Sequence, residues 1–181
     1  MQRRPIKRLD AEGLMIYGLR LLGGRALTLG ELRDRLRRRA AEPADVEEIL
    51  RKLKEQGYLD DRRFAESFAA ARVENQGLGQ SRVLRDLRAR RVAPNIAEKA
   101  VANAFEGKDE TVLIEAFLRR KYRSVVLHEF LAEEKNLASA FRRLRYAGFS
   151  SGNSIRVLKR FASKPEVLDA LESEPEPESG Q

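Results

Sequence analysis

The helical organisation of this chain is set at a joint that reads Gly57-Tyr58-Leu59-Asp60-Asp61-Arg62-Arg63-Phe64-Ala65. Glycine readily adopts the left-handed conformation that ends a helix, and an aspartate carboxylate accepts from the free amides that begin one. One helix is therefore predicted to stop at Gly57 and the next to begin at Asp60 or Asp61. The tyrosine and the leucine are expected to pack the joint, and the phenylalanine to start the buried side of the second helix.

Three helices are predicted upstream of this joint. Asp10 is placed to cap the first, which should run to the Gly23-Gly24 pair. Thr28 and Glu31 have the spacing of a capping box at the start of the second helix. Pro43 suits the first turn of the third, because proline lacks the amide hydrogen that this position leaves unpaired.

The same apolar layout recurs at offsets of 51 and then 57 residues, which is typical of a repeated unit. In the first copy the apolar positions are Leu32, Leu36, Ala41, Val46, Ile49 and Leu50. The matching positions are Val83, Leu87, Val92, Ala97, Ala100 and Val101 in the second copy, and Ala140, Leu144, Phe149, Ser154, Val157 and Leu158 in the third. Three helical repeats are predicted, over residues 10–57, 58–107 and 108–163.

The predicted fold is all-α, because apolar residues recur at helical spacing and strand signals are scarce. It consists of three tandem three-helix repeats, each like a helix-turn-helix unit, in an elongated and curved array. The first helix of the third copy should begin near Asp109 and bury Val112, Leu113, Ala116 and Phe117. A basic segment over residues 1–9 and an acidic tail over residues 164–181 are expected to be disordered.

Charge favours a polyanionic partner. The formal net charge is +8, and residues 172–181 contain four glutamates and no basic residue, so the rest of the chain carries +12. A field of this sign attracts nucleic acid or an acidic protein surface, in a manner that depends on salt. Arginine that merely keeps a helical protein in solution is the alternative.

Composition also excludes several classes of protein. The chain has no cysteine, which excludes disulfides and thiolate metal sites and favours a reducing compartment. No apolar run approaches the length of a membrane span, so a soluble, cytoplasmic protein with no membrane partner is expected. We find no phosphate-binding loop, no histidine cluster and no pair of nucleophile and base, and therefore expect no enzyme activity, no metal and no cofactor.

The joint at residues 57–65, together with Glu31-Leu32-Arg33-Asp34-Arg35-Leu36 and Ala147-Gly148-Phe149-Ser150, resembles the RecX family of regulatory proteins. The resemblance covers about Ala11 to Phe161. The family often has glycine before the apolar residue that opens the third helix of a unit, and only Gly148 matches this pattern here.

The resemblance implies modulation, chiefly inhibition, of the RecA recombinase. RecX-like proteins are understood to lie in the groove of the RecA filament on DNA. There they limit filament growth, strand exchange, ATP hydrolysis and co-protease activity. The implied partners are the RecA filament and single- and double-stranded DNA, bound by a monomer.

Arginine groups on the second helix of each copy are the candidate binding residues, since guanidinium groups bind phosphate and carboxylate in a bidentate way. They are Arg33, Arg35, Arg37, Arg38, Arg82, Arg85, Arg88, Arg91, Arg142, Arg143 and Arg145. A solvated face with partners four residues apart, such as Asp34 with Arg38 or Asp86 with Arg90, is the alternative for any one of them.

A sequence-specific helix-turn-helix regulator of transcription is the other candidate function. Two helices with a short turn and a basic second element are common to both classes. However, no copy offers a convincing set of Asn, Gln and Arg side chains for reading base edges.

Overall fold

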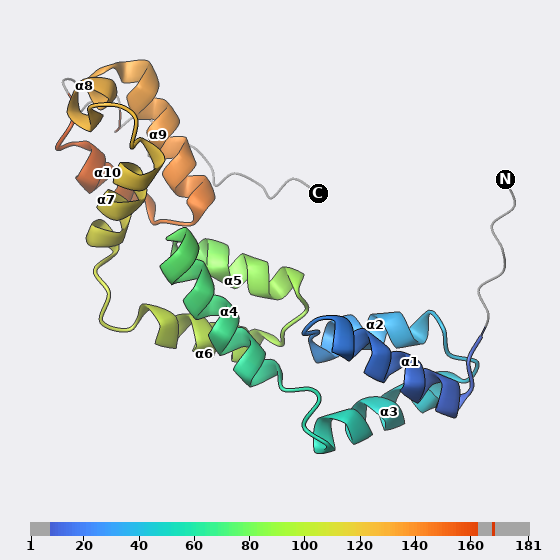
Figure 1. The fold of residues 1–181 in the computed structure, drawn as a ribbon. Coiled ribbons are helices and arrows are strands. Elements are labelled where there is room, and N and C mark those ends of the chain that lie inside the picture. Colours follow the sequence, from blue (N-terminus) through green and yellow to red (C-terminus); the bar gives the residue numbers. More distant parts are fainter. Residues whose placement is uncertain (1–7, 163–167, 169–181) are drawn as a thin grey trace, which may run out of the picture. The chain divides into compact units, whose positions relative to one another are not determined.

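The chain is all-helical over the part that a computed structural model describes, residues 8–162 and residue 168 (Figure 1). This confirms the predicted fold class. The predicted terminal segments lie outside the described residues, except for Arg8, Leu9 and Leu168. The ten helices of the described part are α1 Ala11–Gly24, α2 Leu29–Arg37, α3 Pro43–Glu55, α4 Asp61–Gln76, α5 Gln80–Ala89, α6 Pro94–Phe105, α7 Glu110–Lys121, α8 Leu127–Ala132, α9 Glu134–Ala147 and α10 Ser151–Leu158.

The predicted helix ends are confirmed. The Asp10 carboxylate accepts from the amide of Gly13 at 2.9 Å, and Thr28 and Glu31 form both hydrogen bonds of a capping box. Pro43 occupies the first turn of α3, and Gly57 has a φ of +77° just beyond its end. These local signals mark the limits of the first three helices: the side-chain caps satisfy free amides, and Pro43 has no amide hydrogen to leave unpaired.

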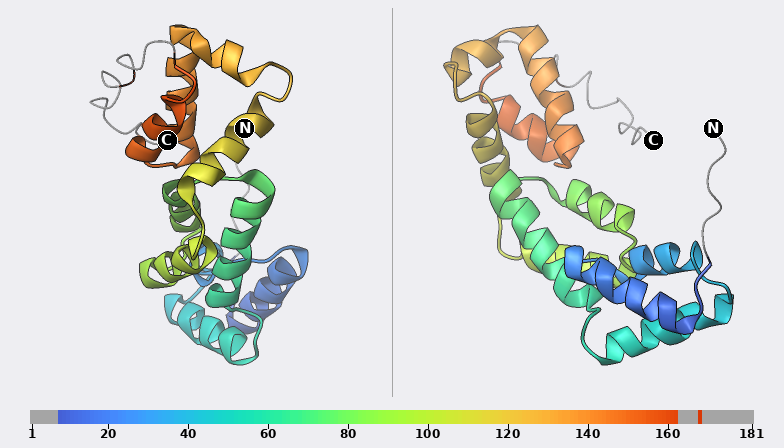
Figure 2. Two further views of the ribbon diagram at one scale, coloured as in Figure 1. Left: turned by 90° about the vertical axis from the view of Figure 1, so that its left-hand side faces the viewer. Right: turned by 45° about the vertical axis from the view of Figure 1, so that its right-hand side comes forward.

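Helices α1, α2 and α3 enclose one hydrophobic core, and both views in Figure 2 show them together. Leu14, Leu32, Leu36 and Leu53 are fully buried in it. Gly18 brings α1 close to the other two helices, and a methyl group at this position would lie 3.4 Å from Leu53 Cδ1. That is ordinary van der Waals distance, so the site has room for alanine.

A second core lies among α7, α8, α9 and α10, with Phe149 buried at its centre. The predicted buried face of α7 is right in part: Leu113 and Phe117 are half-buried and pack against this core, whereas Val112 is 61% exposed and Ala116 is exposed. Ile114 and Leu118 are buried instead. Three successive apolar residues begin this helix, so helical spacing alone does not select the stripe, and packing against α9 and α10 selects it.

The positions matched between the three copies are buried in all cases but one. Ala41 is exposed, and Ala40 is 3% exposed in its place. The cause is a short bridge with Leu9, which donates its amide to the Arg39 carbonyl and accepts from the amide of Ala41. These bonds turn Ala40 inward and Ala41 outward.

One backbone carbonyl at an equivalent place in each copy, before the third helix, accepts a hydrogen bond from an earlier part of the chain. The residue that follows this carbonyl in the chain is Ala40 in the first copy, Arg91 with a φ of +57° in the second, and Gly148 with a φ of +92° in the third. The pairs are the Leu9 amide with Arg39 at 2.7 Å, the Thr28 hydroxyl with Arg90 at 2.6 Å, and the Gly79 amide with Ala147 at 2.8 Å. An equivalent long-range hydrogen bond therefore forms just before the third helix of each copy.

The described chain separates into two compact units. One combines the residues up to Phe68 with Asp86–Ala100, and the other combines Ala69–Arg85 with the residues from Val101 onward. Helices α4, α5 and α6 each run from one unit into the other. The borders of the three sequence repeats thus stay predictions. No helix of the described residues has both the length and the apolar character needed to cross a membrane.

Candidate nucleic-acid interface

The arginines of α2 divide into a paired and an unpaired set. Arg33 donates two hydrogen bonds to the Glu47 carboxylate, at 3.0 and 3.1 Å, and Arg37 donates a third at 3.2 Å. The hydrogen bonds from Arg33 lower the pKa of Glu47 and keep it ionised. Two of the candidate residues therefore already share one carboxylate from α3.

Arg35 and Arg38 have no side-chain partner among the described residues. They lie three positions apart, so they share one face of the helix. The alternative reading paired Arg38 with Asp34, but Asp34 lies 2.6 Å from Arg91 Nε instead. The end of α2 thus presents two guanidinium groups that remain available to an anion.

The candidate arginines of the second copy are mostly engaged. Arg88 donates to Glu98 at 3.3 Å, Arg91 pairs with Asp34, and the Arg82 guanidinium lies 4.8 Å from the centre of the Tyr146 ring. Arg85, half-buried on α5, has no side-chain partner in the part of the chain that the structure describes.

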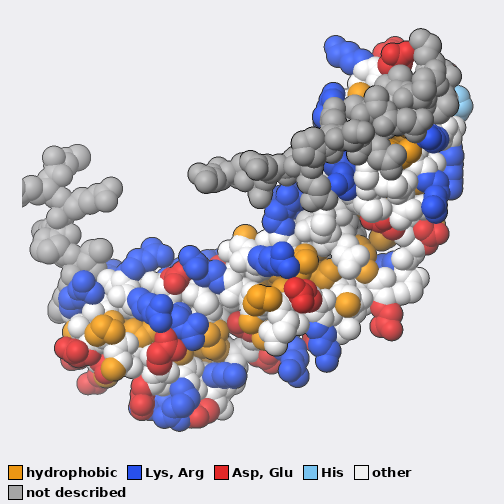
Figure 3. All heavy atoms as spheres, turned by 180° about the vertical axis from the view of Figure 1, so that it is seen from behind, with side chains coloured by type: hydrophobic (Ala, Val, Ile, Leu, Met, Phe, Trp, Pro, Cys, Tyr) orange, Lys and Arg blue, Asp and Glu red, His pale blue; other side chains and the backbone are white. Residues whose placement is uncertain are grey.

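The candidate arginines of α9 have three different environments. Arg145 donates to the Phe149 carbonyl at 2.7 Å, and this bond supports the turn that precedes α10. Arg143 is exposed and lies 5.8 Å from the centre of the Tyr122 ring. Arg142 is exposed as well. On the face drawn in Figure 3, blue basic side chains are interspersed with red acidic ones.

The joint between α3 and α4 is built by its backbone. The amide of Tyr58 donates to Leu53 at 2.9 Å, Leu59 is 4% exposed, and the Asp60 carboxylate accepts from the amide of Arg63 at 2.9 Å. Tyr58 does not pack the joint, because its side chain is 56% exposed. That part of the prediction is wrong, and of the two side chains expected to pack the joint only Leu59 is buried.

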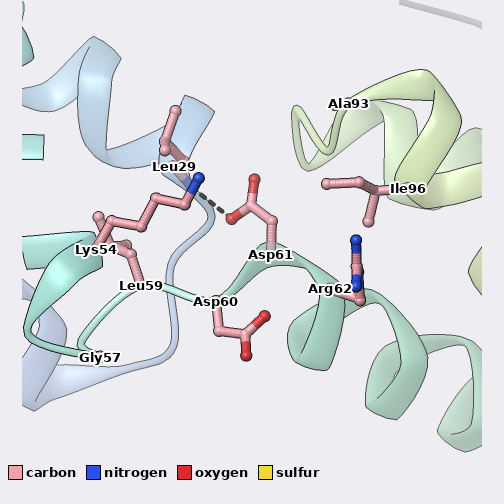
Figure 4. A pocket seen from close by; sticks show the side chains of 9 residues that line it. All are labelled: Leu29, Lys54, Gly57, Leu59, Asp60, Asp61, Arg62, Ala93 and Ile96. Atoms are coloured by element: carbon pink, nitrogen blue, oxygen red, sulfur yellow. Dashed lines mark hydrogen bonds between the residues drawn. The ribbon is translucent and has the colours of Figure 1, made fainter. Parts of the chain in front are cut away.

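Asp61 stabilises a helix from which it is distant in sequence. Its carboxylate accepts from the amide of Leu29, at the start of α2, at 2.7 Å (Figure 4). Burial, together with the neighbouring charge of Asp60, raises the pKa of Asp61. The aspartate pair was identified as the start of α4, and the partner of Asp61 was not foreseen.

Arg90 joins α5 to the start of α2. Its guanidinium donates to the Glu31 carboxylate at 2.7 and 3.1 Å, and lies 4.9 Å from the centre of the Phe64 ring. Phe64 is half-buried and stacks on Phe68, with the ring centres 5.7 Å apart. Ala65, within the buried stripe expected to begin at Phe64, is fully buried, whereas Phe64 and Phe68 form a partly open aromatic pair covered by an arginine.

Several known proteins are similar to this chain in sequence or in fold. A family model described as "RecX, second three-helix domain" matches residues 60–101. "Regulatory protein RecX" of Deinococcus radiodurans is 37% identical over 121 residues, which are 65% of this chain and 56% of that protein. "Regulatory protein RecX" of Vibrio parahaemolyticus is 31% identical over 132 residues, which are 73% of this chain and 81% of that protein. The chain belongs to the RecX family.

A solved structure supports the fold of this RecX-family chain. The crystal structure of RecX from Lactobacillus salivarius matches with a TM-score of 0.64 and 20% identity, over 83% of this chain and 96% of that one. The chain spans little more than half of the Deinococcus relative. Both relatives are named as regulatory proteins, which agrees with the class expected from the sequence.

Two long-range contacts of this RecX-family chain were not predicted from the sequence. Arg90 pairs with Glu31 across 59 positions of the chain and also covers the Phe64 ring, and no local pattern indicates either contact. The capping of α2 by Asp61 spans 32 positions. Within residues 8–162 and 168, no three His, Asp or Glu side chains are grouped closely enough to hold a metal ion.

Proposed function

We propose that this RecX-family chain regulates the RecA recombinase by binding the RecA–DNA filament, chiefly as an inhibitor. Bound along the filament groove, it would limit filament growth and so lower strand exchange, ATP hydrolysis and co-protease activity. The proposal gives the chain no catalytic step and no cofactor. Its partners are the RecA filament and single- and double-stranded DNA, and it acts as a monomer in the cytoplasm.

The observation that carries this proposal is the unpaired state of Arg35, Arg38 and Arg85 in a family of regulatory proteins. An arginine already bound to a carboxylate must break that pair before it binds phosphate, whereas these three have no such cost among the described residues. Each retains the planar set of donors that suits a phosphate or a carboxylate. A formal net charge of +8 adds long-range attraction to DNA.

The test is DNA-dependent ATP hydrolysis by RecA, titrated with this protein. Wild type is expected to lower the rate at substoichiometric amounts, because a filament regulator acts on many RecA subunits at once. The variant Arg35→Gln/Arg38→Gln/Arg85→Gln should need at least about tenfold more protein, since hydrogen bonds between charged groups contribute on the order of 1.5–3 kcal/mol each.

A matched control removes three other surface charges. The variant Arg51→Gln/Lys52→Gln/Lys108→Gln loses side chains that bind within their own helices or to a helix end. It should inhibit within about threefold of wild type, because it keeps the three unpaired arginines. An equal loss of inhibition in both variants would show that only net charge matters. Protection of one particular duplex sequence in the absence of RecA would instead favour a transcriptional regulator.

A further inference from the structure

A hollow of about 600 Å³ lies beside the α3–α4 joint, in the unit that contains α1, α2 and α3. This volume is within the usual range for small-molecule sites, about 300–1,000 Å³. Its lining includes Tyr58, Phe64 and Phe68, which are three of the chain's aromatic residues, together with Asp60 and Arg63. All three rings keep surface that a ligand could cover, because two of them are only half-buried and the third is exposed.

Tyr58 is held in place but left without a ring partner. Its amide is hydrogen-bonded to Leu53 and the next residue, Leu59, is buried, so the backbone is fixed on both sides. Its phenol is 56% exposed and stacks on no other described ring. A rigidly placed, solvent-exposed aromatic ring beside a hollow loses little conformational freedom when a flat ligand stacks on it.

The other aromatic side of the hollow is equally fixed. The Phe64 and Phe68 rings stack at 25° to each other, and the Arg90 guanidinium lies 4.9 and 5.9 Å from their centres. Glu31 holds Arg90 by two hydrogen bonds. The aromatic pair is therefore positioned before any ligand arrives.

The hollow is lined by one acidic and one basic side chain, Asp60 and Arg63. The Asp60 carboxylate is committed to the amide of Arg63 at the start of α4. The Arg63 side chain is exposed and has no partner among the described residues. A hollow with aromatic walls and an unpaired guanidinium at its edge matches a flat ring joined to a phosphate. An apolar protein side chain would make no favourable interaction with the guanidinium.

We propose that this hollow binds one unstacked nucleobase of single-stranded DNA, with Tyr58 stacking on the base and Arg63 binding the adjacent phosphate. The proposal rests on the DNA-binding part of the proposed function. It predicts a preference for single strands at this site, because the bases of a duplex are paired and stacked on each other.

The experiment compares two short strands of equal length and charge, oligothymidine and a strand made only of abasic sites. Tyr58→Ala should bind oligothymidine about tenfold more weakly than wild type and bind the abasic strand equally well, since it removes a stacking surface and no charge. Tyr58→Phe keeps the ring and should bind both strands within about twofold of wild type.

Tyr146→Ala is the matched control, because Tyr146 is 59% exposed and lies in the other unit. It should change the affinities for the two strands by the same factor. The chain has no tryptophan, so Tyr58→Trp introduces a single fluorophore at the site. Its emission should be quenched by oligothymidine and not by the abasic strand at equal occupancy.

Equal affinity of Tyr58→Ala and wild type for oligothymidine would overturn the base site, as would an equal loss on both strands. Weaker binding of Tyr58→Ala to RecA without DNA, with oligothymidine binding intact, would assign the hollow to a protein partner and overturn it too. If inhibition of RecA ATP hydrolysis persists in these cases, the proposed function stands alone. If wild type discriminates the two strands but leaves RecA unaffected, the base site stands and the proposed function fails.

Discussion

The Glu31 side chain makes several stabilising contacts at once. Its carboxylate accepts from the amide of Thr28, binds Arg90 in a bidentate way, and lies 3.6 Å from Arg25. Burial by itself would raise the pKa of Glu31, but these hydrogen bonds and positive charges outweigh it and lower the pKa below its usual value of 4.5. One acid thus caps α2 and fixes the arginine that covers the Phe64 ring.

Replacing this acid is expected to make stability depend less on pH. Because the pKa is lower in the folded state, the carboxylate stabilises the fold above pH 4.5 and this contribution is lost as pH falls through the folded pKa. Glu31→Gln should therefore cost about 1.5–3 kcal/mol near neutral pH and less in acid. Urea denaturation followed by circular dichroism checks this. A cost that is equal at neutral and acidic pH would contradict the ionic role.

Not every charged pair at this scale was visible in the sequence. The sequence predicted the capping box because its two residues lie three positions apart. It did not predict that Arg90 is the partner of Glu31, since nothing local brings α5 to α2. For the same reason, Arg33 and Arg35 looked equivalent in the sequence, and only the position of Glu47 on α3 separates them.

At the scale of elements, contacts between copies determine which glycines can be replaced by a larger residue. Gly30 lies in the first turn of α2, and a methyl group there would come within 2.6 Å of Arg91 Cβ and 2.7 Å of the Arg91 carbonyl oxygen. Gly18 lies inside α1, where the nearest atom to an added methyl is 3.4 Å away. Helix propensity favours alanine over glycine at both positions.

Alanine substitutions at these two glycines should have opposite effects on the free energy of unfolding. Gly18→Ala is expected to stabilise the fold by up to about 1 kcal/mol, because the helix gains propensity without a clash. Gly30→Ala is expected to destabilise it by about 1–3 kcal/mol, because the joint must open. Chemical denaturation of the two variants beside wild type provides the measurement. The same sign in both would show that the joint does not restrict α2.

At the scale of the whole molecule, charge governs how the chain meets DNA. Residues 172–181 contain four glutamates and no basic residue, whereas the rest of the chain has a large excess of positive charge. Opposite charges on one chain compete with an external polyanion for the same cations, and they do so most strongly at low salt. Removing this segment raises the formal net charge from +8 to +12.

Deletion of residues 172–181 is therefore expected to raise affinity for DNA severalfold at low ionic strength, with a difference that shrinks as salt is added. Binding to a labelled oligonucleotide, measured across a salt series, tests this. A variant in which the four glutamates become glutamine keeps the length and should behave like the deletion. Unchanged affinity at low salt would remove any competitive role for this segment.

The sequence by itself determined the all-helical class, the ends of the first helices, the recurring apolar positions and the basic charge. These depend on interactions within a few residues, such as caps, helical spacing and composition. Tertiary structure decided which face of α7 is buried, that Tyr58 is exposed, and which arginines already have an acidic partner. Those outcomes depend on side chains from helices that are far apart in the sequence, and no local sequence pattern shows which of these helices come into contact.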